Sequence, residues 1–346
     1  MRHPIALYAA LTLACEPVAQ RSEVKTFDPA RDSDLLVCEP RLVDFEPASG
    51  IERVTAASDS SLLLLYADAR EVLVVDGALS PLRALQLESE GPTGVVALQD
   101  AISLGDSLFV VADGPRRHLR AFTSDGDPAW VLPLPAVPDR ILPTPAGIVV
   151  FPLHLAGVPS SGPYLVRNGA VDDLAIAPEP ILDPQMRTLA NLVSPTLALG
   201  TSRMIAPRQF IAPVASVIEL GGRSEPAQVP MPIATATAHQ AWWTPRPPYR
   251  ADEMEQIITP AMSATGGPHA GEISVLTRTG HDRGEHLEKV IVRLDHELDV
   301  MSAMTVPFNA MHLAWLPSEQ AYYVVTADDR WHRCELPAPD SLPEVP

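Results

Sequence analysis

The sequence predicts an all-β ring, a six-bladed β-propeller with seven blades as the alternative, on three observations. The chain of 346 residues is rich in turn formers, with 19 glycines and 37 prolines, while 46% of its residues are hydrophobic. Short apolar runs typical of buried strands recur along it. Finally, "YADAREVLVVD" (66–76), "VADGPRRHLRAF" (111–122) and "TADDRWHRCEL" (326–336) repeat one phrase: an apolar run, Ala-Asp, a turn containing arginine and a second run.

The repeated phrase is the hairpin at the centre of each expected blade. Its first strand starts six times, at intervals of 40 to 68 residues, at Ser61, Ser107, Gly147, Arg203, Gly271 and Ala321. Most hairpins are followed by a run that ends near a proline, and several are preceded by a short run such as "RVTAAS" or "AMHLAWLP". Four short antiparallel strands in a unit of roughly 40 to 50 residues are the pattern of a propeller blade.

The repeated Ala-Asp pairs have a structural interpretation. Each aspartate falls where the chain reverses, and its carboxylate can accept hydrogen bonds from the backbone just ahead of it. An arginine follows within a few residues and could pair with that carboxylate. Because the pattern recurs on successive hairpins, we expect a turn motif and not a catalytic pair at Asp68, Asp113, Asp328, Arg70, Arg116 and Arg330.

One repeat carries a family resemblance. The unit "EGPTGVVALQDAISLGDSLFVVADGPRRHLRAFTSDGD" (90–127) resembles the recurring unit of bacterial six-bladed propellers of the NHL-like and TolB-like kind. The resemblance is partial over 51–89 and 308–337 and faint between 138 and 306. Propellers of this kind include both binding modules and enzymes, so the resemblance implies a fold and leaves the function open.

The N-terminus "MRHPIALYAALTLACEP" predicts an export signal. Arg2 supplies a positive charge, and the apolar stretch up to Ala14 is too short to span a bilayer. The end "LTLAC" resembles the lipobox of bacterial lipoproteins, with Thr12 where leucine is usual, and implies lipidation at Cys15. Ordinary secretion with cleavage near Ala14, or a chance apolar N-terminus, are the alternatives.

This reading divides the chain into segments. We expect a signal peptide at 1–14, a flexible tether at 15–33, the propeller at 34–337 and a disordered C-terminal tail at 338–346. The protein would then be lipid-anchored in the bacterial cell envelope, facing the periplasm or the cell exterior.

Closure of the ring predicts a disulfide. The last unit, which begins at Ala310, has only three strands before Pro337, and the segment "DLLVCEPRLVDF" (34–45) precedes the first complete blade. We expect this segment to supply the missing outer strand and so to cover an exposed edge. Cys38 would then lie beside Cys334, and an exported protein favours a disulfide between them.

Residues 233–268 fit the repeat poorly. We expect an insertion at about 244–268, with the remains of a seventh blade as the alternative. The stretch "AWWTPRPPYR" (241–250) combines aromatic residues with arginine, as the centres of binding interfaces do. The candidate ligand-binding residues are Trp242, Trp243, Arg246 and Tyr249, although tryptophans packed between blades would give the same pattern.

No metal or other cofactor is expected, with Ca²⁺ as the alternative. The densest polar cluster lacks the spacing of a zinc motif and predicts an exposed hairpin tip at His281, Asp282, Glu285, His286, Asp295 and His296. Calcium-dependent six-bladed lactonases gather Asn, Asp and Glu around the central channel. This chain has only three asparagines, Asn168, Asn191 and Asn309, the first in an Asn-Gly turn.

Charge and motifs narrow the function. The net charge of −18 and the presence of only two lysines, Lys25 and Lys289, argue against nucleic acid. The sequence contains no G-x-S-x-G, P-loop or C-x-x-C motif. We therefore expect a monomeric, non-catalytic, membrane-anchored binding or scaffold module whose partner is an envelope protein, a glycan or a small ligand. The alternative is a divalent-metal-assisted hydrolase or lyase with its site at the central channel.

Overall fold

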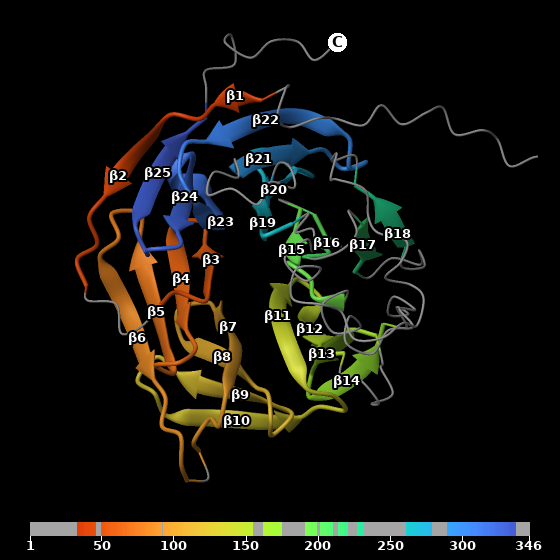
Figure 1. The fold of residues 1–346 in the computed structure, drawn as a ribbon. Coiled ribbons are helices and arrows are strands. Elements are labelled where there is room, and N and C mark those ends of the chain that lie inside the picture. The colour runs from red at the N-terminus through yellow and green to blue at the C-terminus, as the bar shows by residue number, and fades with distance from the viewer. Residues whose placement is uncertain are drawn as a thin grey trace, which may run out of the picture.

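A computed structural model describes residues 33–45, 50–91, 93–154, 162–174, 191–198, 201–209, 214–220, 227–231, 261–278 and 289–336. These residues form six separate sheets, arranged as the blades of a propeller around one central axis (Figure 1). Strands of blade 6 lie against strands of blade 1, so six blades complete the ring. The prediction of a six-bladed β-propeller is confirmed, and the seven-bladed alternative is wrong.

The first three blades follow one another without overlap in sequence. Blade 1 contains β3 (Arg53–Ser58), β4 (Ser61–Tyr66), β5 (Glu71–Asp76) and β6 (Pro81–Gln86). Blade 2 contains β7 (Leu98–Leu104), β8 (Leu108–Asp113), β9 (His118–Thr123) and β10 (Pro128–Pro133). Blade 3 contains β11 (Pro138–Thr144), β12 (Gly147–Pro152), β13 (Tyr164–Arg167) and β14 (Ala170–Asp173).

The other three blades repeat the pattern, and two of them take up N-terminal strands. Blade 4 contains β15 (Thr196–Leu197), β16 (Arg203–Pro207), β17 (Val214–Glu219) and β18 (Ala227–Pro230). Blade 5 contains β19 (Ser263–Gly266), β20 (Ile273–Arg278), β21 (Lys289–Leu294), β22 (Val300–Val306) and the added β1 (Asp34–Leu35). Blade 6 contains β23 (Ala310–Leu316), β24 (Ala321–Thr326), β25 (Trp331–Glu335) and β2 (Cys38–Arg41), with the short 3-10 helix η2 (Pro317–Glu319) after β23.

Apolar clusters fill the space between neighbouring blades. Successive side chains of a strand point to opposite faces of its sheet. Leu62 and Leu64 of β4 therefore pack toward blade 6, while Leu63 and Leu65 pack toward blade 2. The described residues form six such clusters, one between each pair of adjacent blades. This two-sided burial explains why the middle strands are continuous apolar runs and do not alternate with polar residues.

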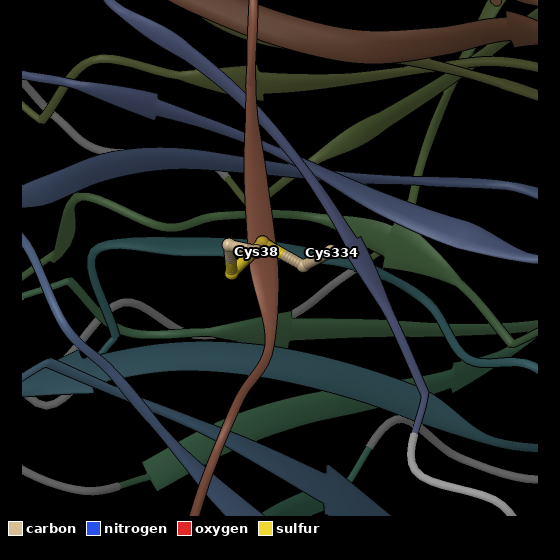
Figure 2. The surroundings of a disulfide bond; sticks show 2 residues. All are labelled: Cys38 and Cys334. Atoms are coloured by element: carbon tan, nitrogen blue, oxygen red, sulfur yellow. A yellow bond between two sulfur atoms is a disulfide. The ribbon is translucent and has the colours of Figure 1, made fainter.

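The ring closes through an N-terminal strand, as the sequence predicts. Strand β2 pairs antiparallel with β25 as the outer strand of blade 6, and Cys38 lies opposite Cys334. The two cysteines form a disulfide across a sequence separation of 296 residues. Figure 2 shows the bridge between β2 and β25. The predicted pairing and the predicted placement of the strand are confirmed.

The segment before β2 also pairs with blade 5, which the sequence did not predict. Residues 34–45 do not form one strand of blade 6, because Asp34 and Leu35 pair in parallel with β22 of blade 5. The backbone N–H of Leu36 also donates to the Thr305 carbonyl at 2.9 Å. The Leu36 side chain is 1% exposed within the cluster between blades 5 and 6, so burial of this leucine directs the chain across both blades.

The C-terminal boundary predicted for the insertion, at about residue 268, lies too far along the chain. Residues 263–266 form β19, the inner strand of blade 5. Ser263 and Thr265 hold this strand through hydroxyl groups: the backbone N–H groups of Leu313 and Trp315 donate to them at 3.2 and 3.1 Å. A strand bound by hydroxyl contacts has no apolar run that a sequence pattern could detect. Residues 232–260 lie outside the described residues.

The repeated Ala-Asp phrase does not place its aspartates equivalently. Asp68 and Asp328 lie in turns, and the Asp328 carboxylate is 2.9 Å from Nε of Arg330 on the surface. Asp113 instead is the last residue of β8 and is fully buried. Arg70 is the residue with positive φ in its turn, where its N–H donates to the Ala67 carbonyl.

Asp113 also binds a different part of the backbone from the one expected. Its carboxylate accepts from the N–H groups of Val96 and Ala97, at 3.4 and 3.5 Å, in the connection that leads into blade 2. Nε of Arg120 and of Arg116 lie 3.5 and 3.9 Å from the same carboxylate. Asp113 therefore joins a hairpin to the preceding connection, and the structural interpretation of this aspartate holds with changed partners.

We predict that loss of the Cys38–Cys334 bridge weakens the ring. Replacing both cysteines by serine should lower the free energy of unfolding by about 4 to 5 kcal/mol, because the bridge closes a very long loop in the unfolded chain. Denaturant unfolding of both proteins, with and without reductant, measures this. Reductant should destabilise only the parent protein, and an unchanged parent midpoint would contradict the prediction.

A candidate functional site in the central channel

The inner strands of the six blades surround a central channel, which contains two adjoining cavities. Figure 1 shows β3, β7, β11, β15, β19 and β23 facing the axis of the ring. The first cavity, of about 590 Å³, lies near the N-terminal ends of these strands. The second, of about 560 Å³, lies toward their C-terminal ends. Arg53, Thr55, Pro195 and Ala264 line both cavities, so the two belong to one channel.

The two cavities differ in chemistry. The first, which we call the channel mouth, has charged and amide side chains in its lining, among them Glu52, Arg140 and Asn309. The second is lined largely by small and apolar residues, such as Ala56, Ile141 and Pro143. A cavity of several hundred Å³ with a few polar groups is the usual form of a small-molecule site. The channel mouth is therefore the candidate functional site.

An ion pair fixes the wall of the mouth between blades 1, 2 and 3. Nη1 of Arg53, on β3, donates to Oδ2 of Asp100 on β7, and the Asp100 side chain is fully buried. The same carboxylate accepts from the N–H of Ala101 at 2.9 Å and of Ile141 at 2.7 Å. Three blades thus meet on one carboxylate, which fixes the position of Arg53 in the wall of the cavity that Arg53 lines.

Arg140 lies beside this pair and has weaker partners. It is half-buried on β11, and its Nη1 donates to the Gln99 carbonyl at a long 3.4 Å. The neighbouring Asp139 is 8% exposed. Burial raises the pKa of the Asp139 carboxyl, and the positive charge of Arg140 opposes that rise. Asp139 is thus a carboxyl whose ionisation is disfavoured next to a guanidinium that lines the mouth.

His312, on β23 of blade 6, provides a neutral imidazole in the lining of the mouth. Its Nε2 donates to the Ile51 carbonyl at 3.0 Å, which leaves Nδ1 as an acceptor. Burial lowers the pKa of His312 to about 4, so the ring carries no charge at neutral pH. Burial, with the positive charge of Arg208, likewise lowers the pKa of His154 to about 4.

Blades 4 and 5 complete the mouth. Lys289, the first residue of β21, is 4% exposed, and its Nζ contacts Sδ of Met262 at 3.2 Å among other contacts. Ser194 and Gln209 of blade 4 are linked by a hydrogen bond of 2.9 Å from Nε2 to Oγ. These residues add a third cation and two polar groups to the lining.

This set of side chains does not suit a divalent cation. Among the described residues that line the mouth, Glu52 is the sole carboxylate, against three cations. Calcium prefers six to eight oxygen ligands, several of them carboxylates. The described lining residues therefore supply fewer carboxylates than a calcium site of the lactonase-like alternative would use.

Asp295 and His296 of the predicted polar cluster lie in the turn after β21, whereas the predicted hairpin tip at 281–286 precedes that strand in the sequence. Asp295, His296 and Glu297 form a turn between β21 and β22, and their ligand atoms lie within 4.8 Å of one another. Oδ1 of Asp295 accepts from the N–H groups of Glu297 and Asp299, at 2.8 and 2.9 Å, as in an ordinary turn. The rest of the predicted cluster, His281, Asp282, Glu285 and His286, lies outside the described residues.

The other predicted sites are distributed differently. Cys38 and Cys334 lie at the outer edge of blade 6, away from the inner strands. Cys15 and the candidate ligand-binding residues Trp242, Trp243, Arg246 and Tyr249 lie outside the described residues. Asn168 begins the predicted Asn-Gly turn, with φ of 50° followed by 77° at Gly169. Asn309 lines the channel mouth.

Sequence reasoning missed the channel residues themselves. Arg53 and His312 occur in runs recognised as inner strands, "RVTAAS" and "AMHLAWLP". A charged or polar residue near the start of an inner strand was a usable signal, because the inner strand of each blade has its free edge on the channel. The run "PDRILPT" that carries Arg140 contains prolines at both ends and was not recognised as a strand.

Comparison with solved structures identifies the class of fold. A member of the DUF4221 family from Bacteroides vulgatus is 9% identical, with 87% of this chain and 96% of that chain covered and a TM-score of 0.57. A luciferin-regenerating enzyme is 12% identical, with 87% of this chain and 95% of that chain covered and a TM-score of 0.54. A streptogramin B lyase is 12% identical, with 87% of this chain and 98% of that chain covered and a TM-score of 0.51. At such identities the likeness shows the fold alone.

Sequence comparison adds no family. No protein-family model matches the chain, and no curated protein matches it. The chain is therefore defined by its fold as a six-bladed β-propeller. Within the described ranges, none of the helices has the length and apolar character needed to cross a membrane.

We predict that the Arg53–Asp100 pair is essential to stability. Asp100→Asn should lower the free energy of unfolding by about 3 kcal/mol or more, because it leaves a partly buried guanidinium without its counter-charge. Asp106→Asn is the matched control: Asp106 is fully exposed, 4.0 Å from Arg83, and its loss should change stability by less than about 0.5 kcal/mol. Denaturant unfolding measures both, and equal effects would contradict the prediction.

We also predict that the free energy of unfolding decreases as the pH falls, because the pKa of His312 is lowered in the folded protein. An unfolded histidine titrates near pH 6.5, whereas His312 titrates near 4, so between these values the unfolded chain binds the proton and the folded chain does not. Stability is thus highest above about pH 6.5 and declines toward pH 4. His312→Gln should reduce the dependence of unfolding free energy on pH between 7 and 5, and His154, whose pKa burial also lowers to about 4, should maintain part of it. His296→Gln, at a site 66% exposed, should leave the slope unchanged.

Proposed function

We propose that this protein is a lipid-anchored binding module of the bacterial envelope that holds a small ligand in the mouth of its central channel. The observation that carries the proposal is the cavity of about 590 Å³, lined from blades 1, 3, 4, 5 and 6 by polar groups above an apolar second cavity. A ligand there would contact residues of the inner strands, such as Arg53 and Arg140, and residues of the connections beside them, such as Ser194 and Asn309.

The disulfide and the N-terminus support a place outside the cytoplasm. Disulfides form and persist in oxidising compartments, and the Cys38–Cys334 bridge joins the two ends of the propeller. The apolar N-terminus that ends in "LTLAC" supplies the features of a lipoprotein signal, with Cys15 as the lipidated residue. The propeller would then be held near a membrane by its N-terminal segment. The proposed protein acts as a monomer and does not bind nucleic acid.

A hydrolase or lyase with its site in the same channel is the second candidate. One observation favours it: burial raises the pKa of Asp139, which precedes the lining residue Arg140, and carboxyls with perturbed pKa values are common at catalytic sites. Against it, the lining offers few carboxylates for a metal-assisted reaction. We favour binding, because the described residues supply a cavity and orienting groups, and among those lining the mouth no nucleophile is paired with a base.

A thermal-shift screen tests the proposal. The probes are small carboxylic acids, phosphates, neutral sugars and quaternary amines, each at millimolar concentration. At least one class should raise the melting temperature, since a ligand at 100 times its Kd adds about 2.7 kcal/mol of stability. Thr55→Phe should abolish the shift, because Thr55 lines both cavities and a larger ring would fill the channel.

The control adds the same ring elsewhere. Val131 lies on the outer strand of blade 2 and is 49% exposed, so Val131→Phe should keep the wild-type shift. If no probe class shifts the wild type, or if Thr55→Phe keeps the shift, the proposed binding site is wrong. Turnover of esters or lactones by the wild type, lost in Asp139→Asn, would instead support the enzyme.

A further inference from the structure

The lining of the channel mouth differs in charge from the rest of the chain. The whole protein carries a net charge of −18. The described residues that line the mouth nevertheless include Arg53, Arg140 and Lys289 against Glu52 alone. The cations come from blades 1, 3 and 5, so the fold and not a local sequence run brings them together. A local excess of positive charge inside an acidic protein requires a specific explanation.

The two arginines of the mouth have different roles. Arg53 has a structural partner, since Asp100 accepts its hydrogen bond within the buried wall. Among the described residues, no carboxylate oxygen lies within 4.0 Å of Arg140, and its hydrogen bond to the Gln99 carbonyl is long at 3.4 Å. A guanidinium has five N–H donors in a planar fork that matches a carboxylate or a phosphate. Arg140 thus has donors to offer to a ligand.

Asp100 balances part of this charge, because its buried carboxylate pairs with Arg53. Asp139 adjoins Arg140, but burial disfavours the ionised form of its carboxyl. Glu52, the sole carboxylate among the described lining residues, is exposed to solvent at the start of blade 1. The many exposed carboxylates elsewhere on the protein act weakly here, because physiological salt screens exposed charges beyond a Debye length of about 8 Å. Among the described residues, Arg140 is therefore a lining cation without a paired carboxylate.

We propose that the ligand of the channel mouth bears an anionic group, a carboxylate or a phosphate, and that Arg140 binds this group directly. This inference rests on the proposed function, because it assigns a chemical class to the ligand of the same cavity. Lys289 adds a second charge from blade 5, and Asn309 can supply an amide to the uncharged part of the ligand. The cavity volume suits a small organic acid or a phosphorylated metabolite rather than a polymer chain.

Calorimetric titration of the full-length protein tests the assignment. The probes are citrate and inorganic phosphate as anions, choline as a cation and glucose as a neutral compound. At least one anion should bind the wild type, while choline and glucose should not. Affinity should fall as salt is raised, because the contact is between opposite charges.

Arg140→Gln should weaken the binding of the anion at least tenfold, and Arg140→Lys should restore part of the lost affinity by returning the charge. Arg167→Gln is the matched control, because Arg167 is exposed in the β13–β14 hairpin and pairs with Asp172 at 3.0 Å, away from the channel. It should bind the anion as the wild type does. Melting curves of all variants show whether each is folded.

The outcomes separate the inference from the proposed function. If the anion binds equally to the wild type and to folded Arg140→Gln, the assignment of Arg140 is wrong. If only glucose or choline binds, and Thr55→Phe removes that binding, the channel binds ligands but the anionic class is wrong. If no probe binds and the wider thermal-shift screen is also negative, the proposed function fails together with the inference.

Discussion

The structure depends on one constraint: every blade is apolar on both faces, so each face must be covered by a neighbouring blade. The apolar clusters make this visible, because alternate residues of a single strand, such as Leu62 and Leu63, belong to clusters on opposite sides. A linear stack of such sheets would leave two apolar faces in water. Closing six sheets into a ring leaves none, and the hydrophobic effect then acts equally at every boundary.

Ring closure makes the two ends of the chain interdependent. Blade 6 lacks an outer strand of its own, and β2 supplies it before blade 1 begins. Strand β1 extends the closure to blade 5, with Leu36 buried between the two pairings and its neighbours Leu35 and Val37 exposed. The disulfide between Cys38 and Cys334 then fixes the pairing covalently. A free edge of blade 6, open to pairing with other chains, is thereby removed.

Prediction from sequence succeeded where burial is two-sided and failed where side chains face the axis. The middle strands are continuous apolar runs, so their positions, the blade count and the closing pair of cysteines could all be inferred. Strand β19 could not, because Ser263 and Thr265 attach it to blade 6 through hydroxyl groups and not through apolar contacts. Asp68 and Asp113 occupy the same place in the repeated phrase, but Asp68 lies in a turn and Asp113 is the last residue of β8. The repeated phrase does not show at which residue the strand ends and the turn begins. The charged residues of the mouth lie far apart in sequence, and only the ring places them together.

The difference between the two cavities sets how deep a charged ligand can go. At the level of Arg53 and Arg140 an anionic group finds guanidinium donors and neighbouring polar side chains. Further along the axis the lining changes to residues such as Ile141, Pro143 and Trp315. An anion moved into that region would leave Arg140 and meet a more apolar lining, which lowers the gain from its charge. A ligand with one anionic end and an apolar body would match both cavities at once, with the anion held at the mouth and the body in the channel.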